Sequence, residues 1–73
     1  MRVSEEQTKK LLEYDGAIRL KQLAMTFALN RFKTKYAANP SEDVVAAYTK
    51  ELNTFLDKYE SIMKDDYEWI VSL

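Results

Sequence analysis

The fold is decided at residues 37–42, which read Ala37-Ala38-Asn39-Pro40-Ser41-Glu42. Proline disfavours helical dihedral angles at the residue before it, so one helix is expected to end ahead of Asn39. Proline is tolerated at the first position of a new helix, where Asn39, or its rival Ser41, can act as the N-cap. Glu42 can then complete a capping box with Asn39. The sequence therefore predicts two helices joined by a turn at residues 38–40.

The segment after this turn carries a long apolar stripe. Its members recur at alternating spacings of three and four, which is typical of a helix that packs along one side; they are Val45, Tyr48, Leu52, Phe55, Tyr59, Ile62, Trp69 and Leu73. Asp66 stands at a stripe position as its one polar member, and the acidic step Asp65-Asp66 can end the helix. We expect a helix over about 40–63 that either extends further or breaks before a 65–73 tail.

The segment before the turn begins with a helix start signal. Ser4 is followed three residues later by Gln7, the spacing of a capping box. A helix is therefore predicted over about 5–37. Within it, Asp15-Gly16 can cause a break or a kink, because glycine inside a helix costs about 1 kcal/mol relative to alanine. We favour a continuous or kinked helix over a reversal of the chain, because no loop-like residues flank this pair.

Apolar residues surround most of the segment from 17 to 36. Projected at 100° per residue they cover roughly two-thirds of a helix circumference; they are Ala17, Ile18, Leu20, Leu23, Ala24, Met25, Phe27, Ala28, Leu29, Phe32 and Tyr36. One antiparallel partner covers a seam only about 100° wide. This segment is therefore expected to contact at least two neighbouring helices.

The composition indicates one all-α domain over residues 1–73. The chain has a single glycine and a single proline, whereas strand-rich chains need many turn residues. It has no cysteine for disulfides and no histidine for metal binding, so association is the remaining way to stabilise so small a core. We expect a homodimer in which two helical hairpins form a four-helix bundle. The alternative is a monomeric three-helix bundle, with a break at Asp15-Gly16 or near Asp65 supplying the third helix.

Charge divides the chain into two halves. Residues 1–38 hold eight Lys and Arg against four Asp and Glu, whereas residues 39–73 hold three against eight. A basic helix that packs antiparallel to an acidic one explains this division, because opposite charges help to set the register.

Catalytic signatures are missing from the sequence. It contains no glycine-rich phosphate loop and no nucleophile elbow, so we expect neither enzymatic activity nor a cofactor. The acidic residues Asp57, Glu60, Asp65, Asp66 and Glu68 lack the spacing of a calcium loop and are interpreted as a solvated face, with no metal. No apolar run reaches the roughly 20 residues of a membrane span, and no secretory signal is visible, so a cytoplasmic protein is expected.

These observations favour a small protein-interaction module that acts as an adaptor, inhibitor or regulator, with itself and an unidentified protein as partners. The residues expected at the self-association or partner interface are Ile18, Leu20, Leu23, Phe27, Phe32, Tyr67, Trp69 and Ile70. The alternative is a nucleic-acid-associated protein, because basic residues interleaved with aromatic ones can follow a phosphate backbone. Its expected contacts are Lys21, Arg31, Lys33 and Lys35.

Overall fold

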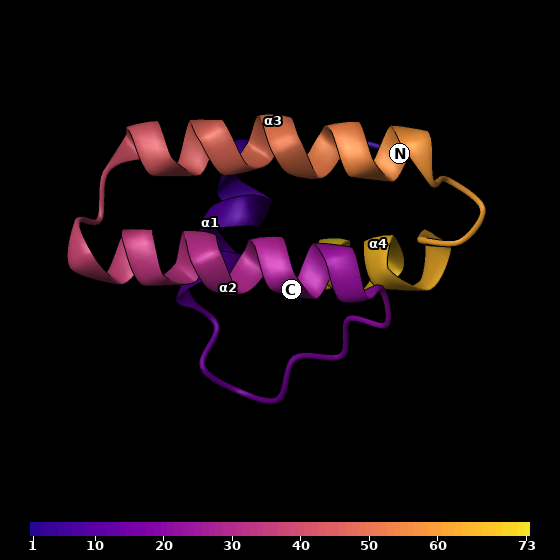
Figure 1. The fold of residues 1–73 in the computed structure, drawn as a ribbon, viewed down its shortest axis with the longest axis horizontal. Coiled ribbons are helices and arrows are strands. Elements are labelled where there is room, and N and C mark those ends of the chain that lie inside the picture. The colour runs from indigo at the N-terminus through magenta and orange to yellow at the C-terminus, as the bar shows by residue number, and fades with distance from the viewer.

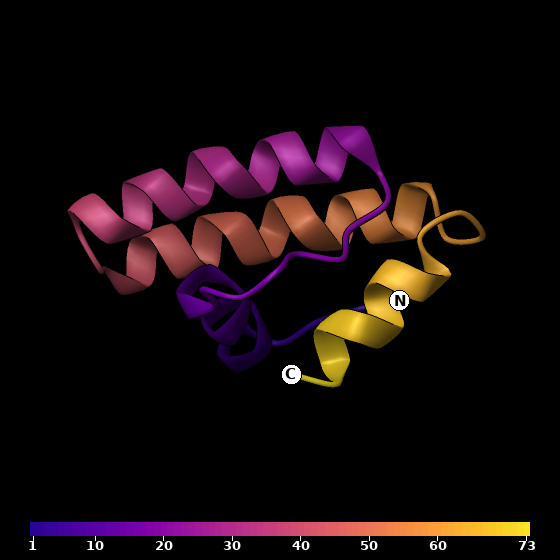
Figure 2. The same ribbon diagram turned by 90° about the horizontal axis from the view of Figure 1, so that it is seen from below.

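Four helices form the chain in the computed structural model, which describes the backbone of residues 1–73 and every side chain except that of Ala24. They are α1 (Glu5–Glu13), α2 (Leu23–Ala38), α3 (Glu42–Lys58) and α4 (Lys64–Val71). Figure 1 shows α2 and α3 side by side and antiparallel. Figure 2 shows α1 and α4 together on one side of this pair. The prediction of an all-helical chain is confirmed, and the radius of gyration of 11.1 Å makes it compact.

The turn between α2 and α3 occupies residues 39–41, one residue later than predicted. Ser41, rather than Asn39, is the N-cap of α3, and its hydroxyl accepts a hydrogen bond from the Val44 amide at 3.4 Å. Glu42 and Asp43 occupy the first turn of α3, where the helix dipole favours negative charge.

The prediction of one helix over residues 5–37 is wrong. The capping box at its start is present, because Ser4 Oγ accepts from the Gln7 amide at 3.2 Å and Gln7 Oε1 accepts from the Ser4 amide at 2.9 Å. Helix α1 nevertheless ends at Glu13, and α2 begins only at Leu23. Residues 14–22 form a non-helical linker, so the favoured continuity through Asp15-Gly16 is replaced by a full break.

Burial in this linker alternates from residue to residue. Ile18 and Leu20 are half-buried and pack against the core, whereas Ala17, Arg19 and Lys21 between and beside them are exposed. A period of two is the pattern of extended backbone, in which successive side chains point to opposite sides. The linker therefore contributes alternate side chains to the core, which a helix over the same residues could not do.

Helix α4 holds the end of the linker in place. The Lys21 amide donates to Asp66 Oδ1 at 3.0 Å, and Lys21 Nζ contacts Asp65 Oδ2 at 2.9 Å. The hydrogen bond and positive charge of Lys21 lower the pKa of the Asp65 carboxyl below its usual value. Asp66 is 1% exposed, so its stripe position does correspond to a buried side chain.

All four helices, together with Val3 and Met63, contribute side chains to one apolar core. Its buried members are Val3, Leu11, Leu12, Met25, Leu29, Phe32, Val45, Tyr48, Leu52, Leu56, Met63 and Ile70. Helix α1 packs against α2, α3 and α4, so the molecule is more than the predicted two-helix hairpin. Part of the apolar circumference of α2, represented by Met25 and Leu29, is covered within the single chain by these additional elements.

Tyr48 brings a hydroxyl into this core without a hydrogen-bond partner among the described residues. Its side chain is 1% exposed. Burial raises the pKa of the phenol above its usual value, and the negative charge of Glu51 raises it further. A buried, unpaired polar group costs roughly 1–3 kcal/mol, so we expect Tyr48→Phe to raise the free energy of unfolding by about 1 kcal/mol at pH 7. Urea denaturation measures this change.

The same substitution has an expected pH signature. The pKa of Tyr48 is higher in the folded chain than in the unfolded one, so the unfolded chain loses the phenol proton first as the pH rises. The free energy of unfolding is therefore independent of this group below about pH 10 and declines above that value. Tyr48→Phe should therefore make the stability fall less steeply in alkali. Tyr59→Phe is the matched control, because it removes the same hydroxyl from a tyrosine that is 38% exposed. Identical alkaline profiles for wild type and Tyr48→Phe would contradict this reasoning.

Candidate interaction face

Large apolar side chains remain uncovered along α2, α3 and the turn that follows α3. Leu23 is 84% exposed, Phe27 72%, Ile62 59% and Tyr59 38%. Phe55 is half-buried and lies among them, because it lines the same surface hollows as Leu23, Phe27, Tyr59 and Ile62. We call these five residues the outer face.

Helix geometry explains why α2 is apolar on two opposite sides. Met25 and Leu29 are 1% and 0% exposed and point into the core. Phe27 lies two residues from each of them, and each residue turns the helix by 100°, so Phe27 points about 160° away. Leu23 precedes Phe27 by one helical turn and lies on the same side. One side of α2 therefore packs into the core, and the other side is exposed to solvent.

The outer face is hollowed between α2 and α3. One hollow of about 460 Å³ is lined by Leu23, Phe27, Ala28, Arg31, Glu51 and Phe55. A smaller one of about 120 Å³ is lined by Gln22, Met25, Phe55, Tyr59, Ile62 and Met63. Phe55 belongs to both, and its ring stacks on that of Tyr59 with centroids 6.2 Å apart. The two hollows therefore adjoin at Phe55, and we call them together the apolar groove.

Basic residues border this groove. Arg31 Nη2 lies 3.2 Å from Glu51 Oε1, which joins α2 to α3 at one end of the face. A further hollow of about 460 Å³ beside Phe55 is lined by Lys50 and Lys58. In the part of the chain that the structure describes, neither lysine has a carboxylate within 4 Å. These hollows are thus lined by three positively charged side chains and by one negatively charged side chain, that of Glu51.

The predicted interface residues fall into three groups. Leu23 and Phe27 lie together on the outer face. Phe32 and Ile70 were assigned to the interface incorrectly, because they are 6% and 0% exposed. Phe32 packs against Tyr48 of α3, and Ile70 lies on α4, which packs against α1. The remaining four residues are half-buried against the chain's own core: Ile18, Leu20, Tyr67 and Trp69.

Trp69 illustrates how the C-terminal tail is used within the chain. Its ring packs edge-on against Tyr14, with centroids 5.3 Å apart, and thereby joins α4 to the residue that follows α1. The C-terminal tail therefore packs against the chain's own fold.

Three residues of the outer face were not predicted to form an interface. Phe55, Tyr59 and Ile62 belong to the regular stripe after the turn, and that stripe was interpreted as core. The signal that distinguishes them is Leu56 and Met63, which widen the stripe on one side and are 0% and 1% exposed. Because the core takes the Leu56 side of the stripe, the Phe55 side is turned outward.

The four basic residues of the nucleic-acid alternative do not form one patch. Arg31 and Lys35 both lie over the ring of Phe32, at 5.2 and 5.3 Å from its centroid. Lys33 instead donates to the carbonyl oxygen of Tyr14, and Lys21 pairs with Asp65. Two of the four therefore face the linker and α4, away from the other two.

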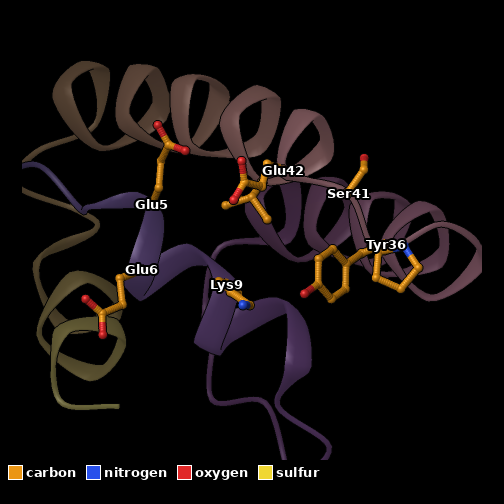
Figure 3. Close-up of a pocket in the computed structure, with 8 residues that line it drawn as sticks. Glu5, Glu6, Lys9, Tyr36, Ser41 and Glu42 are labelled. Carbon is orange, nitrogen blue, oxygen red and sulfur yellow. The ribbon is translucent and has the colours of Figure 1, made fainter.

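A polar pocket of about 270 Å³ lies between α1 and the α2–α3 turn. Figure 3 shows its charged side chains, with Glu5, Glu6 and Lys9 contributed by α1 and Glu42 by α3. All four are exposed, and the Glu6 carboxylate is turned away from Tyr36 across the pocket. The charged side chains that line this pocket are therefore in contact with solvent.

Two further features bear on function, namely groups of metal ligands and helices that could span a membrane. Among the described residues, no three or more His, Cys, Asp and Glu side chains come together in a group that could hold a metal ion. None of the four described helices combines the length and apolar character needed to cross a lipid bilayer. The chain matches no protein-family model, and comparisons with curated proteins and with solved structures likewise give no match.

Proposed function

We propose that this chain is a small, non-enzymatic protein-interaction module that forms a helical homodimer through its outer face. The observation that carries the proposal is the exposure of Leu23 and Phe27, at 84% and 72%, beside a groove that continues to Phe55. Contiguous apolar patches of this kind on soluble proteins mark interaction sites. In the dimer, α2 and α3 of each copy form the four central helices.

The size of the outer face indicates the strength of this dimer. A large side chain contributes roughly 150–250 Å² when it is buried, so the exposed parts of Leu23, Phe27, Tyr59 and Ile62 amount to on the order of 500 Å² per copy. Two copies would bury roughly 1,000 Å² from these residues, near the lower limit of a specific interface. The dimer is therefore expected to be weak, with association at micromolar concentrations.

Sedimentation of the wild-type chain and of Phe27→Asp tests the proposal. We expect a species of twice 8.6 kDa that accumulates as the wild-type concentration rises through the micromolar range. Phe27→Asp places a charge in the apolar contact, so the dissociation constant should rise at least about tenfold, equivalent to 1.4 kcal/mol.

Ala46→Asp is the matched control for this substitution. Ala46 is exposed on α3 and lies half a turn around the helix from Phe55, outside the outer face. Ala46→Asp adds the same charge as Phe27→Asp and should leave the dissociation constant of the dimer unchanged. Both variants should keep the helical circular dichroism of wild type, because both positions are exposed. A wild-type chain that remains monomeric up to hundreds of micromolar would rule out the homodimer.

A further inference from the structure

The charges around the outer face favour an acidic partner more than they favour a second copy. Lys50 and Lys58 border the apolar groove without carboxylate partners, and Arg31 is matched only by Glu51. A second copy that docks through the same face carries the same positive excess. Like charges that meet across an interface weaken it, whereas opposite charges steer and strengthen association.

The exposed apolar area of the outer face also favours a helix of another protein over a second copy. The face offers on the order of 500 Å² of exposed apolar surface per copy, so face-to-face pairing of two copies gives only a minimal interface. A helix of another protein that lies in the groove contacts the side chains that line the hollows as well as the exposed ones at their edge. It also contacts the half-buried Phe55, where the hollows meet. Docking of an amphipathic helix in a groove is a recurring mode of recognition between proteins.

We propose that the outer face binds an amphipathic helix of another protein that carries acidic residues along one flank, and that this helix displaces the second copy. The apolar side of the helix fills the hollow formed by Leu23, Phe27 and Phe55. The acidic flank lies over α3 and contacts Lys50 and Lys58. The inference rests on the outer face being an interaction site, and it adds the chemistry of the partner.

The spacing of the two lysines predicts the spacing of the acids. Lys50 and Lys58 are eight residues apart, which is about 12 Å along α3 at 1.5 Å per residue. On a partner helix that runs alongside α3, residues seven or eight apart span the same distance on one side. The preferred ligand therefore has acidic residues at i and i+7 next to apolar residues at three- and four-residue spacings.

Fluorescence anisotropy with two designed peptides tests this inference. Both probes are labelled amphipathic helices with the same leucine pattern; one has glutamate at the flanking i and i+7 positions and the other has lysine. We expect the glutamate peptide to bind at least tenfold more tightly, with a preference that declines as salt rises. In the double variant Lys50→Glu/Lys58→Glu the order of the two affinities should reverse.

The control variant is Lys9→Glu/Lys10→Glu, which makes the same change in net charge on α1. Both lysines are exposed on α1 and do not line the outer face, so the preference for glutamate should persist. Equal binding of the two peptides, or a preference that survives Lys50→Glu/Lys58→Glu, would overturn the inference. Tighter binding of a DNA duplex or of an anionic phospholipid vesicle than of the glutamate peptide would also overturn it, because the partner would then be of another class.

Sedimentation with and without the glutamate peptide separates this inference from the homodimer. A dimer that the peptide converts into a one-to-one complex supports both. If the chain is a dimer and the peptide does not bind, the homodimer stands and the acidic partner is ruled out. If the chain is a monomer that binds the peptide through Lys50 and Lys58, the homodimer is ruled out and the acidic partner stands.

Discussion

Leu29→Ala should lower the free energy of unfolding by roughly 2–5 kcal/mol, because Leu29 is completely buried in α2 and its removal leaves a cavity. A chain of this size has a total stability of only about 4–11 kcal/mol, so the loss is a large fraction of the whole. The midpoint of thermal unfolding should fall by roughly 8 °C or more. Urea denaturation and a thermal melt measure the two quantities.

Leu23→Ala removes the same atoms from the same helix and is the matched control. Leu23 is 84% exposed, so its loss should change the stability of the monomer by no more than about 0.5 kcal/mol. The comparison is made at a concentration where the chain is monomeric, since Leu23 belongs to the outer face. Equal losses for the two variants would show that the two sides of α2 are not distinguished as described.

The all-helical class and the turn near Pro40 could be predicted because they depend on local chemistry. Glycine and proline are scarce, which favours helix throughout the chain. Pro40 and the capping residues Ser4 and Ser41 act on backbone groups only a few positions away. The stripe after the turn was predicted only in part. Asp66 is buried at its stripe position, but α3 ends at Lys58 rather than near residue 63, and Tyr59 and Ile62 of the stripe are exposed.

The linker 14–22 could not be predicted in the same way, although one sign of it was present. Ile18 and Leu20 alternate with Arg19 and Lys21, a two-residue period that is also compatible with a helix when the neighbouring residues are apolar. The linker is held instead by tertiary contacts, such as the hydrogen bond from the Lys21 amide to Asp66, which is 45 positions away. Tertiary contacts of this kind override local helix propensity, and a single sequence does not reveal them.

Which residues form the exposed outer face could be predicted only in part, for a similar reason. The excess apolar circumference before the turn correctly indicated that α2 has more apolar surface than one neighbour can cover. Which residues remain outside depends on how α1 and α3 pack against α2: Phe32 is buried beside Tyr48, whereas Phe27 is exposed. The division between core and surface therefore depends on elements whose positions only the structure gives.

Asn53→Ala is expected to have the second large effect, because Asn53 holds the N-terminal segment against α3. Its Oδ1 accepts from the Val3 amide at 2.7 Å, and its Nδ2 donates to the Val3 carbonyl at 3.0 Å. Both residues are buried, at 8% and 5% exposed. The substitution leaves two buried backbone groups unpaired, each costing about 1–3 kcal/mol, so the total loss should be about 2–5 kcal/mol.

Hydrogen exchange distinguishes this mechanism from a general loss of packing. If residues 1–4 detach so that Val3 regains its bonds to water, the Val3 amide should exchange much faster in Asn53→Ala, while the amides of α2 lose protection only in proportion to the global stability. Asn30→Ala removes the same side chain from an exposed site on α2 and should change the stability by no more than about 0.5 kcal/mol. An unchanged exchange rate at Val3 would show that Asn53 does not anchor the N-terminal segment.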